Sequence, residues 1–481
     1  MPNANSHRKL WLLTLVGGLI GFGLLGTVWL PVTDGTERVD STTIPSPSTT
    51  GRPPTSTSGA AAPSSTSSPT SAGSVDTTST TAQDDEETES ETTVATVGGV
   101  DADLFVAPMA RGTGSGLSAA DAAGIHQLNE LIASAQPDDV IELVTDAGPY
   151  LISQSINLTA GGTSGHPITI RGPINGPRPE LRGDRANPYD PAGEPGKPLF
   201  RLANGADHLV FGNLHCTRMG NGCFYVAAPI ADLVIANVSA SNVRRFFENG
   251  AGEGQANATI VGLTISNVEV SGFSKGAIRL GYDTHSVRIT DVVGDSMQND
   301  GDNFAIGVHL GDTVHDVIIE RVRMDNARDT LHEYWNGDGF VAEAGVYDLQ
   351  LIDTSASGNT DAGYDIKASD VQLVNAAAHD NKRNFRLWGQ NMVLQECIGT
   401  DPELRGGSGT QAQVHVAESA TVEIVGGSFT DADPDTIVFD VDDSAHLIVR
   451  GTYVEHAGAA QLSTVEATAS IELVQIVENI V

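Results

Sequence analysis

Short segments in which apolar and polar residues alternate recur from residue 208 onward. Successive segments begin 21 to 32 residues apart, and each is followed by Asn, Asp, Gly or Ser, as expected of a strand that ends in a turn. The first five segments are HLVFGNL at 208, DLVIANV at 232, NATIVGLTI at 257, SVRITDV at 286 and DVIIERV at 316. A repeat of this length is typical of a solenoid, and the helical spacing of three and four residues is absent. The pattern therefore predicts a parallel β-helix.

An amphipathic stretch before the repeat predicts a capping helix. Apolar residues recur at helical spacing over residues 118–135, Ser118 is placed to act as the N-cap, and Pro137 ends the pattern. We expect this helix to cover the first coil, whose exposed edge would otherwise template aggregation. The fold class is thus all-β, with a β-helix domain over residues 96–481.

Stretches that align without gaps set the register between neighbouring coils. Side chains alternate faces in a strand, so this register separates inward columns from outward ones. The inward columns are Ile278, Val308, Phe340, Tyr364 and Phe385, and Leu280, Leu310, Ala342, Ile366 and Leu387. The outward columns are Arg279, His309, Val341, Asp365 and Arg386, and Gly281, Gly311, Glu343, Lys367 and Trp388. The apolar character of both inward columns supports the register.

The outward columns bring charged side chains together, because neighbours in a column lie about 4.8 Å apart. Asp365 is expected to contact Arg386, and Lys367 is expected to lie between Glu343 and Trp388. These pairs are either surface salt bridges, which contribute less than about 1 kcal/mol, or parts of a site. An exposed indole such as that of Trp388 suits stacking on a sugar ring.

His309 beside Arg279 is a second candidate pair for substrate binding, although a histidine on a strand surface is commonly without a role. Carboxylates also gather in the turns just before these strands, at Asp338 and Asp361. Carboxylates that converge from successive coils offer the oxygen ligands that Ca²⁺ prefers. The alternative is structural, since aspartates in turns often bond to their own backbone.

The charge balance narrows the choice of partners. The chain carries 61 Asp and Glu against 26 Lys and Arg, a formal charge of −35, and such a field repels phosphate backbones. Nucleic acid is therefore excluded as a partner. Three cysteines are too few for a disulfide scaffold, but in an exported domain Cys216 and Cys223 can form a small disulfide loop, with Cys397 left buried and inert.

The amino-terminal 95 residues predict a membrane anchor and a stalk. Residues 10–32 are almost uncharged and long enough to span a bilayer, so we expect a transmembrane signal-anchor after a cytoplasmic segment, residues 1–9. A cleaved signal peptide is the alternative. Residues 33–95 are rich in Ser, Thr, Pro and acidic residues and are predicted to be a disordered linker. The β-helix domain is then extracellular, on a single-pass protein of the cell membrane.

The opening coils, DDVIELV and SGHPITIRG, resemble those of right-handed parallel β-helix proteins of the pectate lyase-like superfamily. Three motifs, NGDGF at 336–340, NTDAGYD at 359–365 and NFRLWG at 384–389, are similar to segments of family 9 polysaccharide lyases. This resemblance implies that Asp338, Asp361 and Asp365 are calcium ligands. It also implies that Arg386 stands where the family has its Brønsted base, a lysine.

The chemistry implied is abstraction of the proton at C5 of a uronate. Ca²⁺ neutralises the neighbouring carboxylate and stabilises the charge that develops, which also lets an acidic protein bind an acidic polysaccharide. Arginine is a poor base because its pKa exceeds about 12. Lys367 is therefore the alternative base, with Arg386 as a bidentate clamp for the substrate carboxylate.

The leading hypothesis is a surface-anchored, Ca²⁺-dependent polysaccharide lyase or C5 epimerase, monomeric and acting on a uronate-containing polysaccharide. One alternative is a non-catalytic carbohydrate-binding or adhesive β-helix, in which Trp388 and the carboxylates bind glycan. The other is an inverting glycoside hydrolase, which needs carboxyl groups roughly 6.5–9.5 Å apart. Asp300, Asp302 and Asp338 are the residues that could supply them.

Overall fold

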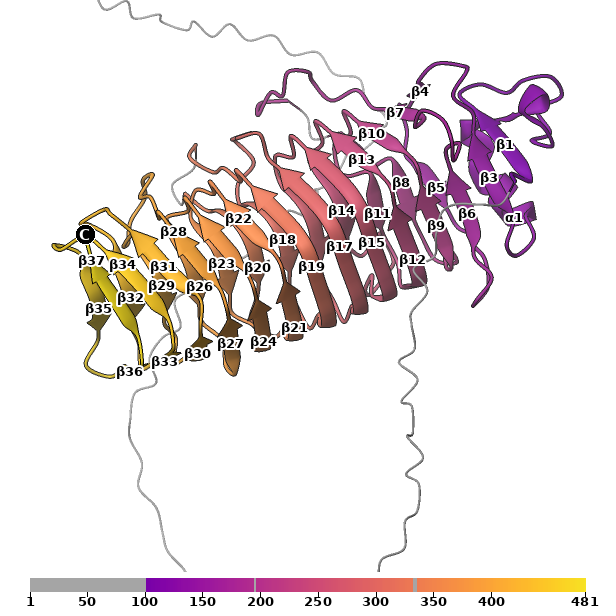
Figure 1. The fold of residues 1–481 in the computed structure, drawn as a ribbon. Coiled ribbons are helices and arrows are strands. Elements are labelled where there is room, and N and C mark those ends of the chain that lie inside the picture. The colour runs from indigo at the N-terminus through magenta and orange to yellow at the C-terminus, as the bar shows by residue number, and fades with distance from the viewer. Residues whose placement is uncertain (1–100, 194–195, 332–334) are drawn as a thin grey trace, which may run out of the picture. The chain divides into compact units, whose positions relative to one another are not determined.

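The computed structural model describes residues 101–193, 196–331 and 335–481, which form a solenoid of stacked coils (Figure 1). The named strands of this part pair in parallel, each with the equivalent strand of the coils before and after it. The predicted all-β parallel β-helix is therefore confirmed. The predicted cytoplasmic segment, anchor and linker, residues 1–95, lie outside the described residues.

One sheet forms a continuous face of the solenoid and carries the outward columns. Among the described residues its strands are β5 (Ile156–Leu158), β8 (Phe200–Leu202), β11 (Phe224–Val226), β14 (Arg245–Asn249), β16 (Gly276–Leu280), β18 (Ala305–Leu310), β20 (Gly337–Ala342), β23 (Ala362–Ile366), β26 (Arg383–Leu387), β29 (Ala412–Val416), β32 (Ile437–Val441) and β35 (Gln461–Val465). We call this sheet the site face. The predicted register is confirmed along it, since Arg279 pairs with His309, and Asp365 pairs with Arg386.

The other sheet bends around the remaining two sides. Its first side contains the segments that define the repeat: β3 (Val140–Leu143), β6 (Ile168–Arg171), β9 (Leu209–Gly212), β12 (Ile230–Ala236), β15 (Ile260–Ser271), β17 (His285–Asp295), β19 (His315–Asp325), β21 (Tyr347–Ile352), β24 (Ser369–Val374), β27 (Met392–Gln395), β30 (Thr421–Val425), β33 (His446–Arg450) and β36 (Ser470–Val474). Strands β15, β17 and β19 are long enough to continue onto the second side.

The second side of the bent sheet is made of short strands and the ends of the long ones. They are β4 (Tyr150–Leu151), β7 (Glu180–Arg182), β10 (His215–Thr217), β13 (Ser239–Ser241), β22 (Ser355–Ser357), β25 (Ala377–His379), β28 (Ile398–Thr400), β31 (Ser428–Asp431), β34 (Tyr453–His456) and β37 (Val477–Ile480). At the corner the chain turns through one residue with positive φ, such as Asn237, Asn267 or Asn375. Asparagine tolerates this conformation, which explains the turn residue after each repeat segment.

The core is a stack of the predicted inward columns. The rings of Phe340, Tyr364 and Phe385 lie parallel, with centroids 5.0 and 5.1 Å apart, and Phe429 meets Phe385 edge-on. All four side chains are fully buried. Three successive coils thus contribute rings at the spacing of the strands, and the aromatic contacts add to the apolar burial.

The amino-terminal end differs from the predicted capping helix over 118–135, which is wrong in its extent. Residues 119–121 and 125–127 form 3₁₀ turns, and α1 (Leu128–Ser134) is the α-helix. The continuous helix is broken because Ala123 and Gly124 form β2 and pair with β1 (Leu104–Ala107). Ser118 caps the first 3₁₀ turn rather than α1.

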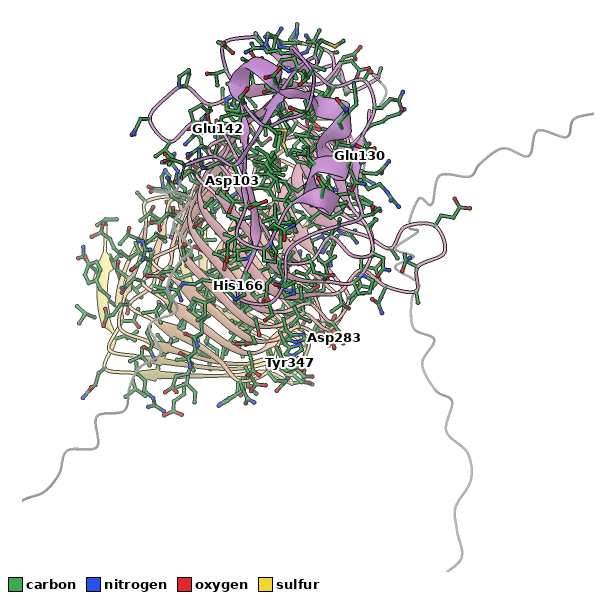
Figure 2. The ribbon with its side chains drawn as sticks, turned by 90° about the vertical axis from the view of Figure 1, so that its right-hand side faces the viewer. Asp103, Glu130, Glu142, His166, Asp283 and Tyr347 are labelled. Carbon is green, nitrogen blue, oxygen red and sulfur yellow. A yellow bond between two sulfur atoms is a disulfide. The ribbon has the colours of Figure 1, made fainter. Side chains whose placement is uncertain are left out.

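The cap itself is present. Figure 2 shows α1, marked by Glu130, at the amino-terminal end of the solenoid, near Asp103 and Glu142. Leu128, Leu131 and Ile132 of α1 are buried against the core. The first coil is therefore covered as expected, although by a shorter helix.

Aromatic and imidazole rings from equivalent positions in three successive coils stack on one another. His315 stacks on Tyr347 with centroids 4.7 Å apart and lies 3.7 Å from Asp283, in the region where Figure 2 labels Tyr347 and Asp283. These side chains are at the start of strands of the bent sheet, away from the site face.

The cysteines behave as predicted. Cys216 and Cys223 form a disulfide, and Cys397 is buried, where burial raises its pKa to about 12. The Cys397 thiol is thus protonated at neutral pH and inert. In the described part of the chain the helices are too short to cross a bilayer.

Candidate functional site

The candidate site lies on the site face where β20, β23 and β26 run side by side. Val341, Asp365 and Arg386 are register partners across these strands. Their side chains point away from the core, because Phe340, Tyr364 and Phe385 in the preceding positions fill it. Because side chains alternate between the two faces of a strand, the register that stacks aromatic rings inside the solenoid also brings charged groups together outside it.

Three carboxylates that the sequence offered as calcium ligands lie near one another on these strands. Asp361 precedes β23 and Asp365 lies within it, whereas Asp338 lies within β20 rather than in the turn before it. The strand begins earlier than predicted because Gly337 already pairs with Ala305 of β18. One carboxylate oxygen of Asp338 accepts a hydrogen bond of 2.7 Å from the amide of Ala362.

Two features of this carboxylate cluster show unmet demand for positive charge. Burial, together with the neighbouring carboxylates of Asp361 and Asp365, raises the pKa of Asp338 well above its usual range. Oδ1 of Asp365 is buried without a hydrogen-bond partner. A buried carboxylate oxygen is normally paired, and a cation beside it would relieve both features. The cluster thus fits a hard divalent cation at Asp338 and Asp365.

Asp361 is different, because protein cations already surround it. Its Oδ1 lies 3.4 Å from Nζ of Lys382 and 3.2 Å from Arg383, and its Oδ2 lies 3.2 Å from Arg386. Lys382 directly precedes β26, and Arg383 and Arg386 lie within it. A calcium ion that uses Asp361 as a ligand would therefore share this carboxylate with Arg386.

Arg386 is held as a cation at the centre of the site. One of its terminal nitrogens, NH1, lies 3.2 Å from Asp361 and 3.8 Å from Asp365, and its guanidinium carbon lies 4.2 Å from the ring centroid of Trp388. Its Nε is buried and has no hydrogen-bond partner. A guanidinium fixed between carboxylates and an indole is suited to binding an anion and unsuited to removing a proton.

Lys367 lies on the same face, next to Arg386. Its Nζ is 2.9 Å from Oε2 of Glu343 and 3.3 Å from Oδ2 of Asp365. Burial lowers the pKa of Lys367, but Asp365 and Glu343 raise it more, so its pKa is above the usual value. Burial likewise raises the pKa of Glu343, while His309 and Lys367 lower it to about 2. The Lys367–Glu343 pair is therefore fully ionised at neutral pH.

The predicted substrate-binding residues are divided between two places. Trp388 is half-buried beside Arg386, and its Nε1 has no hydrogen-bond partner. His309 reaches the site through Glu343, with 3.7 Å between its Nε2 and Oε1. Arg279 does not reach the site. It lies on β16, three strands from Asp365, and pairs at 3.2 Å with Glu248 of β14.

Two of the three aspartates considered for a hydrolase, Asp300 and Asp302, are occupied elsewhere. The third, Asp338, belongs to the carboxylate cluster and has a raised pKa. Asp300 accepts hydrogen bonds from Thr330, and Asp302 pairs with Arg244 at 3.1 Å. Burial raises the pKa of each of these aspartates, but their partners lower it further, so both have pKa values below the usual one. An inverting hydrolase needs a protonated carboxyl group as its acid, and neither aspartate is one.

Several side chains near the site were not anticipated. Lys382 and Arg383 contact Asp361, and His415 and Asp440 continue the outward column after Arg386. The signal for His415 was present in the sequence, because QVHVA at 413–417 aligns with NFRLW at 384–388. Lys382 has a pKa lowered by burial, but its side chain is covered and bonded to the carbonyl of Ser408.

The parallel pairing of equivalent strands in successive coils defines the fold. It is a parallel β-helix, built from two parallel sheets of stacked coils. No protein-family model and no curated protein matches this sequence.

Solved structures similar to this β-helix differ in activity. Pectate lyase Pel9A is 16% identical, with a TM-score of 0.47 over 67% of this chain and 79% of its own. The lacto-N-biosidase of glycoside hydrolase family 136 from Eubacterium ramulus is 12% identical, with a TM-score of 0.48 over 79% of this chain and 68% of its own. The periplasmic alginate epimerase AlgG is 8% identical, with a TM-score of 0.46 over 73% and 82%. At such identities the likeness concerns the fold and not the activity.

Proposed function

We propose that this pectate lyase-like β-helix is a carbohydrate-active enzyme that abstracts the C5 proton of a uronate residue, as a polysaccharide lyase or C5 epimerase. One observation carries the proposal. Two buried carboxylates, Asp338 with a raised pKa and Asp365 with an unpartnered oxygen, lie beside two outward cations, Arg386 and Lys367. This arrangement combines a place for a divalent cation, an anion clamp and a base on one strand face.

Asp338, Asp361 and Asp365 would hold Ca²⁺, which supplies neutralisation of the substrate carboxylate and of the charge that develops at C5. Arg386 binds the same carboxylate through its two terminal nitrogens and stays protonated throughout. Its contact with Trp388 fixes the plane of the guanidinium, so the clamp is set before the substrate binds.

Lys367 takes the proton at Nζ. It must be neutral to do so, and its ion pairs with Asp365 and Glu343 oppose this in the free protein. Engagement of the Asp365 charge elsewhere would remove the largest contribution that raises the pKa of Lys367 against the effect of burial, and so would favour its neutral form. Loss of the C4 oxygen then gives the lyase product, whereas return of a proton from the other face gives the epimer.

The remaining parts of the proposal concern location and partners. The chain would be held at the cell membrane through residues 10–32, with the β-helix extracellular and monomeric. Its partner would be an acidic polysaccharide, which a charge of −35 repels unless cations intervene.

The test is an assay of the full chain on polygalacturonate, polymannuronate and polyguluronate, with Ca²⁺ or with a chelator. A lyase produces the ultraviolet absorbance of unsaturated uronates, and an epimerase incorporates deuterium from D₂O at C5. We expect Lys367→Met to lower kcat by about 10²- to 10⁴-fold, the usual range for a general base. Lys197→Met, which removes an exposed lysine bonded to Gln154, should leave it unchanged.

Full activity of Lys367→Met would exclude Lys367 as the base. A second candidate function is glycan binding without chemistry, and the ionised Lys367–Glu343 pair favours it. Retained affinity for a polyuronate with neither product would support that function instead.

A further inference from the structure

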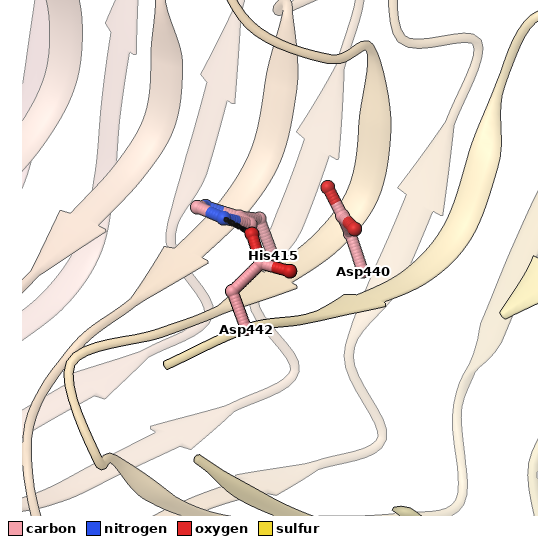
Figure 3. Close-up of side chains that lie close together, drawn as sticks. All are labelled: His415, Asp440 and Asp442. Carbon is pink, nitrogen blue, oxygen red and sulfur yellow. Dashed lines mark hydrogen bonds and ion pairs between the residues drawn. The ribbon is translucent and has the colours of Figure 1, made fainter. Parts of the chain in front are cut away.

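A second cluster of metal-ligating side chains lies further along the site face. His415 on β29 and Asp440 on β32 are register partners, and Asp442 follows β32 on the same face (Figure 3). One ligand atom of each residue lies within 4.8 Å of the others. His415 is also the register partner of Arg386, so this cluster stands two strands from Asp365.

His415 is not satisfied by its protein contacts. The residue is only 8% exposed, its Nε2 lies 3.2 Å from Oδ2 of Asp442, and its Nδ1 is buried without a hydrogen-bond partner. Buried imidazole nitrogens normally have a donor, an acceptor or a metal. The imidazole thus faces Asp442 through Nε2 and keeps an unmet hydrogen-bonding demand at the buried Nδ1.

Asp440 is held in a fixed orientation. The hydroxyl of Thr410 donates to its Oδ2 over 2.7 Å, and the hydroxyl of Thr464 donates to its Oδ1. A carboxylate can accept about four hydrogen bonds, so lone pairs remain for a cation. Outer contacts of this kind orient the ligands of metal sites in proteins.

The cluster opens onto a pocket of about 420 Å³. The residues that line it include His415, Asp440, Asp442, Arg383, Thr464 and Glu466. A cation bound by the first three would thus face solvent on one side. Arg383 connects the pocket with the first cluster, because it also contacts Asp361.

We propose that His415, Asp440 and Asp442 bind a divalent transition ion of the Zn²⁺ class, with its remaining coordination positions open to the pocket. One imidazole and two carboxylates form a mixed nitrogen and oxygen set, which suits Zn²⁺ and disfavours Ca²⁺, an ion that takes oxygen ligands. The open positions accept water or an oxygen of a bound ligand. This site is separate from the calcium cluster and does not depend on the proposed activity.

The test is calorimetric titration of the full chain with Zn²⁺ and, separately, with Ca²⁺, after removal of bound metals with a chelator. We expect His415→Gln and Asp442→Asn each to abolish one Zn²⁺ equivalent or to weaken it by more than about 100-fold, because loss of a ligand should exceed the effect of an outer contact. His446→Gln is the matched control, since His446 is exposed and bonded to Ser470.

Circular dichroism checks the fold of each variant, and Asp442, which is partly exposed, provides a variant that should fold if His415→Gln does not. Asp338→Asn should weaken the binding of Ca²⁺ and leave the binding of the Zn²⁺ equivalent unchanged. This difference separates the present proposal from the proposed calcium site. The proposal is overturned if the folded variants bind as much Zn²⁺ as the wild type, or if Asp338→Asn removes the same equivalent.

Discussion

At the scale of the residue, the site is governed by which charges are compensated. Asp361 is paired with three protein cations, whereas for Asp338 burial and two neighbouring carboxylates outweigh the charge of Arg386, and Oδ1 of Asp365 has no hydrogen-bond partner. Asp338 is thus neutral in the absence of a metal ion, even at a pH at which an exposed carboxyl group is ionised. The folded state therefore holds a proton that the unfolded chain releases.

This difference predicts a pH dependence of stability for the metal-free protein. Both states are protonated below about pH 3.9, the usual carboxyl pKa, so Asp338 has no effect there. As the pH rises, the unfolded chain loses this proton and the folded protein keeps it, so the free energy of unfolding falls until Asp338 ionises in the folded state. Asp338→Asn should remove this contribution, because asparagine is neutral and its Oδ1 still accepts from Ala362.

Urea unfolding in a chelator at several pH values measures the effect. At pH 7 we expect Asp338→Asn to be more stable than the wild type, since the folded variant has no buried carboxyl group whose ionisation is suppressed. Added Ca²⁺ should stabilise the wild type more than the variant. Asp348→Asn, at an exposed position, is the control, and equal pH profiles for wild type and Asp338→Asn would contradict the account.

At the scale of the element, the strands behind the site are joined by a ladder of buried amides. Nδ2 of Asn359 donates to Asn381, Nδ2 of Asn381 donates to Asn384, and Nδ2 of Asn384 donates to Gln413, over 2.9 to 3.0 Å. These side chains are almost completely buried. The ladder fixes the turns that carry Asp361 and Lys382 to the strands below.

Asn381→Ala should therefore destabilise the protein and displace the site. It leaves the amide and side chain of Asn359 without their acceptor and removes the donor to Asn384, so we expect a loss of about 2–4 kcal/mol. The midpoint of urea unfolding measures this loss. Asn157→Ala, on the exposed side of β5, should cost less than about 0.5 kcal/mol. A similar cost for both variants would show that the ladder has no special role.

The strand register was predictable from the sequence, whereas these cross-coil contacts were not anticipated. Alternation and gapless alignment sufficed to place Asp365 beside Arg386, because a strand has a period of two. The same register pairs Ala362 with Arg383 and so brings Lys382 and Arg383 beside Asp361, but the motifs drew attention to the carboxylate as a metal ligand and not to its partners. The prediction of one helix over 118–135 was wrong because a non-local contact, the pairing of Ala123 with β1, outweighed the local helical preference.

At the scale of the whole molecule, an acidic solenoid must bind an acidic polymer if the proposed function is right. The chain has a formal charge of −35, and the cations Arg386 and Lys367 are surrounded by carboxylates. At low ionic strength the repulsion extends over about 30 Å, and at physiological ionic strength over about 8 Å. Without a divalent cation, added salt should thus favour association of the protein with the acidic polymer, because it screens their repulsion. Salt has the reverse effect on oppositely charged partners.

The prediction concerns the sign of this salt effect. In a chelator, the association rate of the full chain with polygalacturonate should rise as NaCl screens the repulsion. With Ca²⁺ bound at Asp338 and Asp365, a local attraction is added, and salt should then slow association or leave it unchanged. In the presence of Ca²⁺, the association rate of Asp338→Asn should depend on salt as that of the wild type does in chelator, whereas the rate of Asp348→Asn should not. Association that falls with salt in the chelator would mean that a cationic patch, and not a bound metal ion, attracts the polymer.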